Sequence, residues 1–119
     1  MIPINNRQSN VTTQKITASP VLGTPLLYRV NEDTIGNPVA IQNQASHTLA
    51  IQAANFGGGT VTIEWSLDAL AWNSLLDFNE QPAIFTQNTL KVGLTFTGIY
   101  LRASLSGSTN AKNVTVTIG

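Results

Sequence analysis

Two carboxylates near the middle of the chain, Glu64 and Asp68, are the residues best placed for catalysis. Such a pair can cleave a glycosidic bond when the two groups face each other across a sugar ring. Here the sequence places Glu64 on the polar face of a strand and Asp68 in the turn that follows. The single histidine, His47, has no cysteine or Gly-x-Ser-x-Gly motif beside it. We therefore expect structural roles for both acids, no catalytic residue, and a protein that is not an enzyme.

Oxygen ligands for calcium are a second chemical possibility. Asp68, Asp77 and Glu80 flank neighbouring turns, and carboxylates are the ligands that Ca²⁺ prefers. The compact, closely spaced acids of a calcium-binding loop are absent from the sequence, and scattered acids are usually solvated. The sequence therefore predicts neither a metal site nor a cofactor.

Three consecutive glycines, Gly57, Gly58 and Gly59, come directly before Thr60. A phosphate-binding loop needs a lysine followed by Ser or Thr, and then a helix whose amides face the anion. Neither follows here, because the next residues alternate as a strand does. We interpret the glycines as a structural turn at the tip of a hairpin that joins residues 47–54 to residues 60–67, where glycine permits positive φ.

Ser66, Asp68 and Trp72 have the spacing of a second tight turn. The Asp68 side chain can accept hydrogen bonds from the amides just after it, and Trp72 can cover the turn from the return strand. The pattern resembles the Ser-x-Asp-Gly-x-x-Trp hairpin of β-sandwich domains, including discoidin-like domains and small virion proteins of tailed phages. Ala69 stands where that hairpin has glycine, so we do not expect positive φ at this position.

The composition is unusually poor in charge. Only 10% of the 119 residues are charged, against about 25% in ordinary domains. Thr, Asn, Ser and Gln supply 42 residues, and the six basic residues balance the six acidic ones. Such a surface cannot neutralise a phosphate backbone, so we expect no nucleic-acid partner. Near-zero net charge instead favours self-association.

The sequence also gives expectations about location. Its first residues lack the basic start and apolar stretch of a signal peptide, and no apolar run approaches the roughly 18 residues of a membrane helix. We expect synthesis in a host cytoplasm and no membrane partner.

Alternating apolar and polar residues predict the fold. The alternation is clear in residues 47–54, 60–67, 98–106 and 113–118, and in the second of these Val61, Ile63, Trp65 and Leu67 are expected to face the core. Weaker strand candidates are residues 11–17, 25–30, 38–42, 72–76 and 88–93, and no helix longer than a turn is expected. The pattern predicts an all-β antiparallel sandwich, Ig-like or jelly-roll-like, of seven to nine short strands. Residues 21–119 would form this single domain, after an extended N-terminal arm and connection at residues 1–20.

Residues 59–118 resemble, more loosely, the sandwich proteins of phage virions. The resemblance rests on the strand-turn-strand of residues 59–76, the strand from Tyr100 to Gly107, and the Val/Thr-rich end of the chain. It implies a virion component, most often a decoration (cement) protein on the capsid surface, whose partners would be the major capsid protein and copies of itself, a trimer among the possible forms. The partner-binding residues expected on this interpretation are Met1, Ile2, Pro3, Ile4, Arg7 and Tyr100.

Two alternatives stay open. Within the virion, the protein would be a tail, neck or baseplate component. Outside that class, it would be a carbohydrate-binding sandwich, in which Trp72, Tyr28 and Tyr100 form an aromatic platform for sugars.

Overall fold

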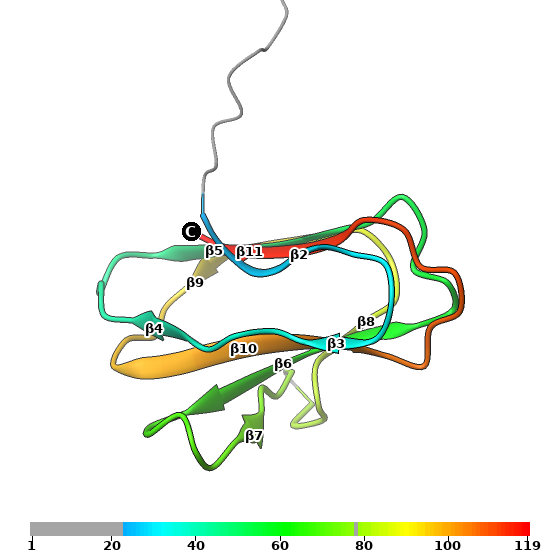
Figure 1. The fold of residues 1–119 in the computed structure, drawn as a ribbon. Coiled ribbons are helices and arrows are strands. Elements are labelled where there is room, and N and C mark those ends of the chain that lie inside the picture. Colours follow the sequence, from blue (N-terminus) through cyan, green and yellow to red (C-terminus); the bar gives the residue numbers. More distant parts are fainter. Residues whose placement is uncertain (1–22, 78) are drawn as a thin grey trace, which may run out of the picture.

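The computed structural model of the protein describes residues 23–77 and 79–119. They form two antiparallel sheets that lie face to face (Figure 1), so the predicted all-β sandwich is confirmed. The described residues contain ten strands, more than the seven to nine expected, because β3 and β8 are two-residue strands that alternation cannot reveal. No helix that could span a membrane occurs in this part of the chain.

Each sheet has four strand positions. The first sheet has the order β2 (Thr24–Val30), β11 (Val114–Ile118), β5 (His47–Gln52) and β9 (Thr89–Leu94). In the second sheet β10 (Ile99–Ser106) pairs with β6 (Thr60–Ser66). The short strands β3 (Thr34–Ile35) and β4 (Val39–Ile41) both pair with β10, and β7 (Asn73–Ser74) and β8 (Ile84–Phe85) both pair with β6. The two edges of the second sheet are therefore interrupted strands.

The chain crosses from one sheet to the other at nearly every connection. If β3 and β4 are taken as one strand position and β7 and β8 as another, only the connection from β6 to β7 stays within a sheet. A sandwich of eight strand positions wound in this way is a jelly roll, whereas an Ig sandwich keeps more consecutive strands together. Of the two sandwich types expected, the strand order matches the jelly roll.

The core fills the space between the sheets. Its buried side chains come from the alternating positions of the long strands, and the predicted inward faces of residues 47–54, 98–106 and 113–118 are largely confirmed: Leu49, Ile51, Leu101, Ala103, Leu105, Val114, Val116 and Ile118. The weaker candidates 25–30, 38–42, 72–76 and 88–93 correspond to β2, β4, β7 and β9. The candidate at residues 11–17 lies outside the described residues.

The predicted inward face of residues 60–67 is wrong at its end. Val61 and Ile63 are buried and Trp65 is partly buried against the core, but Leu67 is 72% exposed and Ser66 is fully buried. The alternation stops because β6 ends at Ser66. The backbone then bends into the next turn, which needs the Ser66 hydroxyl beneath it.

The glycine turn does not close a hairpin. Strand β5 belongs to the first sheet and β6 to the second, so the loop of residues 53–59 bridges the two sheets at one end of the sandwich. Alternation indicated correctly that each strand has one buried face. It carries no information about which of two facing sheets a strand joins, and the hairpin prediction is wrong for that reason.

Gly36 allows the two sheets to approach closely beside β3. Its N–H donates to the carbonyl of Ala103 at 2.8 Å. A Cβ atom at this position would lie 1.9 Å from the Leu26 carbonyl oxygen.

We expect Gly36→Ala to destabilise the sandwich by about 3 kcal/mol or more, because backbone on both sides must move. Gly58→Ala is the matched control, since a Cβ there meets nothing within 4 Å and the cost is only that of its positive φ, about 1 kcal/mol. Urea unfolding of the two variants measures the difference. Equal losses would contradict the close approach at Gly36.

Candidate functional site

The turn between β6 and β7 is held by the two side chains that the sequence indicated for it. The Ser66 hydroxyl donates to Asp68 Oδ1 over 2.9 Å and accepts hydrogen bonds from the N–H groups of Asp68 and Ala69 at 3.1 and 2.8 Å. Asp68 Oδ1 also accepts from the N–H groups of Leu70 and Ala71 at 2.9 and 3.0 Å. Five hydrogen bonds thus organise one short turn around a hydroxyl and a carboxylate oxygen.

Ala69 adopts the left-handed conformation, with φ of 62°. The expectation that alanine would avoid positive φ here is wrong. The amides before and after Ala69 are fixed by Ser66 and Asp68, and this geometry determines the backbone whichever residue is present. The glycine of the similar hairpins therefore corresponds to a real conformational demand.

The pKa of Asp68 is lowered from its ordinary value of 3.8. The causes are the hydrogen bonds from the N–H groups of Ala71 and Leu70 and then from the Ser66 hydroxyl. Asp33 also has a lowered pKa, because the hydroxyl and N–H of Ser108 and the N–H of Gly107 donate to it. Each carboxylate is stabilised in its charged form as an acceptor for backbone amides, so neither is suited to donate a proton at neutral pH.

Glu64 is engaged on the outer face of the second sheet. Arg102 lies opposite it on β10, and its Nε donates to Glu64 Oε1 at 2.7 Å. The Arg102 guanidinium lies 4.3 Å from the centre of the Trp72 ring, so one ring face is occupied. This ion pair, and not a facing carboxylate, determines the position of Glu64.

The three aromatic residues considered for sugar binding do not all share one surface. Trp72 lies beside Arg102 on the outer face of the second sheet, where Tyr100 is half-buried and pairs with Ser66 and Ala40. Tyr28 belongs to β2 in the first sheet and is exposed there. Partner binding by Tyr100 stays a prediction.

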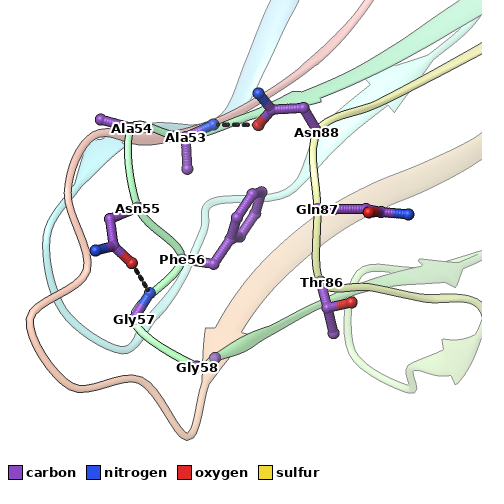
Figure 2. A pocket seen from close by; sticks show the side chains of 10 residues that line it. Ala53, Ala54, Asn55, Phe56, Gly57, Gly58, Thr86, Gln87 and Asn88 are labelled. Carbon is purple, nitrogen blue, oxygen red and sulfur yellow. Dashed lines mark hydrogen bonds between the residues drawn. The ribbon is translucent and has the colours of Figure 1, made fainter.

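The glycine loop borders a shallow hollow of about 470 Å³ at one end of the sandwich. Figure 2 shows Phe56 projecting between this loop and residues 86–88. Gly57 and Gly58 both have positive φ in a turn closed by the N–H of Gly59 and the carbonyl of Phe56. The amide oxygen of Asn88 already accepts from the N–H of Ala53 at 2.9 Å, as Figure 2 also shows.

The hollow offers little chemistry for a ligand. No charged residue lines it, and the amide oxygen of Asn55 is occupied by the N–H of Gly57 at 2.7 Å. Among the residues described, no group of three or more His, Asp or Glu side chains could hold a metal ion. His47 is buried at the start of β5, where its ring stacks on Phe96 and its Nε2 lies 2.9 Å from the Asn43 carbonyl oxygen.

A more apolar cleft opens along one side of the sandwich, and we call it the side cleft. It has a volume of about 440 Å³ and lies between β9 of the first sheet and residues 75–85 of the second. It is lined by Leu49, Leu75, Leu76, Asp77, Pro82, Ala83, Ile84, Phe85, Lys91 and Leu94. Leu76 and Ile84 are 53% and 58% exposed. Sequence reasoning missed this feature, whose only signal was the apolar content of a segment without alternation.

The outer face of the first sheet carries one uncharged row of residues that crosses all four strands. The strand registers align Pro25, Thr117, Ala50 and Leu90 in one row over the four strands. The next row contains Thr115 and Gln52, and the exposed Arg29 of β2 lies beside it, with its N–H donating to Thr115 Oγ1 at 3.1 Å. Leu90 and Val92 on β9 are 66% and 67% exposed. We call the uncharged row, together with Val92, the neutral face.

The remaining predicted site residues, Met1, Ile2, Pro3, Ile4 and Arg7, lie outside the described residues. Comparison of the chain with protein-family models, with curated proteins and with solved structures found no match.

We expect Ala69→Gly to stabilise the protein by about 0.5–1 kcal/mol, because glycine adopts the left-handed conformation without the steric cost that alanine meets. Thermal unfolding measures the change. Ala71→Gly is the control, since Ala71 has no positive φ, and it should not be stabilising. A lower melting temperature for Ala69→Gly would contradict the strain assigned to this turn.

Asp68 should also make stability depend on pH. Its pKa is lower in the folded state than in the unfolded chain, so its contribution is complete above the unfolded value and is lost as the pH falls through the folded one. We expect Asp68→Asn to flatten the dependence of the unfolding free energy on pH between about pH 5 and pH 2. Asp33→Asn should remove a separate part of the same slope, and an unchanged slope in both variants would contradict the assignment.

Proposed function

We propose that the protein is a structural component of a larger assembly, and specifically a decoration protein on the outer surface of a phage head. The observation that carries the proposal is the neutral face, where Leu90 and Val92 are exposed beside Ala50 and Thr117. Exposed apolar side chains in an uncharged row of a sheet are typical of surfaces that contact another protein.

The charges of the described residues support contacts of this type. Asp33, Asp68 and Asp77 accept hydrogen bonds from nearby loops, and Glu64 is paired with Arg102. Because only 10% of the residues in the chain are charged, few ionic contacts are available to it. Attachment through the neutral face would therefore depend little on salt concentration.

The location on a phage head rests on the resemblance of residues 59–118 to virion sandwich proteins. The jelly-roll strand order is compatible with it, since this architecture occurs in viral capsid proteins, but it occurs in lectins too. Fold analogy alone therefore does not separate the two classes. The division of Trp72, Tyr28 and Tyr100 between two sheets favours the structural role over a sugar-binding platform.

The partners proposed are the major capsid protein and further copies of this chain. The first residues, with Ile2 and Ile4 separated by one proline, would supply an apolar contact to such a partner. Only the assembled state gains these contacts, so binding would stabilise the shell by mass action.

The test is the copy number of the protein in purified virions, measured by quantitative peptide mass spectrometry. We expect a number comparable with that of the major capsid protein, because a decoration protein repeats with the lattice. A handful of copies would move the protein to the tail, neck or baseplate. Absence from the particle would overturn the structural role and favour the glycan-binding alternative.

A further inference from the structure

We propose that the side cleft is the docking site for the N-terminal segment, residues 1–22, of a second copy of this chain. The inference rests on the proposed structural role and names one partner and one surface for it. The apolar lining of the cleft, the free edge of β9, the charge distribution and the place where the described chain begins each support it.

The side cleft lies beside an edge strand of the first sheet. The sheet order places β9 at the edge of the first sheet, and within the described residues β9 pairs with β5 alone. An incoming extended chain could therefore add backbone hydrogen bonds to β9, as occurs when a peptide extends a sheet. The cleft volume of about 440 Å³ lies within the usual range for sites that bury apolar groups.

The first residues of the chain have the chemistry that this cleft requires. If the segment binds as an extended strand, Ile2 and Ile4 would lie on the same side of it, and the intervening Pro3 suits an edge strand, where no hydrogen bond from its nitrogen is needed. Their partners would be the aliphatic and aromatic side chains of the lining, among them Leu76 and Phe85.

The charges of the two parts are complementary. Residues 1–22 contain Arg7 and Lys15 and none of the six acidic residues. Residues 23–119 therefore keep four basic residues against six acidic ones. Asp77 lies at the rim of the cleft, and Glu80 lies in the adjoining turn, where its N–H donates to the carbonyl of Asp77. We call these two acidic residues the acidic rim. Lys91 is the one basic residue that lines the cleft.

Arg7 can reach this acidic rim when Ile4 is bound. The two residues are three positions apart, about 10 Å in an extended chain. Lys15 is eight positions further along and does not share this constraint, which makes it a matched control.

The strand that follows the N-terminal segment, β2, and the strand beside the side cleft, β9, lie on opposite edges of the first sheet. Gly23 precedes β2, whose edge is separated from that of β9 by β11 and β5, about 14 Å at the usual strand spacing. Within one chain, a segment that paired with β9 and then led directly to Gly23 would run parallel to β9. All strand pairs of the described sheets are antiparallel. A second copy can supply the antiparallel direction, so we assign the segment to a neighbour.

Cross-linking between single-cysteine variants tests the contact, because the chain contains no cysteine of its own. Full-length Ile4→Cys is mixed with full-length Leu76→Cys and treated with a short bis-maleimide. Leu70→Cys is the matched control, since Leu70 is 84% exposed and does not line the cleft. We expect the mixed cross-link to form at least about tenfold faster with Leu76→Cys, as the effective concentration of a docked segment requires.

Charge reversal provides an independent readout. Adding Arg7→Glu to the Ile4→Cys chain should lower the yield of the mixed cross-link, whereas adding Lys15→Glu should change it much less. Equal effects of the two reversals would overturn the role given to the acidic rim.

Each cross-linking outcome decides the proposal. Equal rates with Leu76→Cys and Leu70→Cys would overturn docking in the side cleft. An Ile4→Cys/Leu76→Cys double variant that links only within one chain would overturn the assignment to a second copy. The experiment uses purified protein, so its failure would leave the copy number in virions untouched. A low copy number would likewise leave an observed cross-link standing.

Discussion

The pairing of β10 with β6 is the interaction on which most of the structure depends. Its register joins seven residue pairs from Tyr100 with Ser66 to Ser106 with Thr60. On the inner face it aligns Leu101, Ala103 and Leu105 with the other half of the core. On the outer face it places Arg102 against Glu64. A shift of one residue would reverse both faces at once, because side chains alternate along a strand.

The chain has few charges, and its side-chain hydrogen bonds between distant segments come largely from uncharged residues and from Asp33. Polar side chains are used mainly to hold turns and to join neighbouring strands. Thr62 and Ser104 share a hydrogen bond of 2.8 Å across the pair, and Asp33 joins the turn before β3 to the loop after β10. Asn31 similarly accepts from the N–H of Asn113 at 2.9 Å. No charged residue lies in the row from Pro25 to Leu90 across the first sheet, and that row is the basis of the proposed function.

Alternation predicted the sandwich because it reports directly which side of a strand is buried. It failed where burial has another origin. Ser66 is buried because a turn folds over its hydroxyl, and Leu67 is exposed because the strand has already ended. At Ala69 local hydrogen bonds outweigh the intrinsic preference of alanine for negative φ. The bridge between sheets at residues 53–59 and the side cleft depend on pairing between distant segments, which a single sequence does not encode in local patterns.

The arrangement of edges limits the assemblies that the chain can form. When a segment leaves from one edge of a sheet and docks at the other, the two contacting surfaces differ, so the interface is heterologous. Successive copies then join head to tail, and the series closes as a ring only if the rotation between neighbours divides a full turn. A ring of this kind would repeat the neutral face once per copy. Weak contacts to a lattice would then act together, because binding by one copy raises the effective concentration of the others. Attachment without strong charges thus becomes compatible with a stable complex.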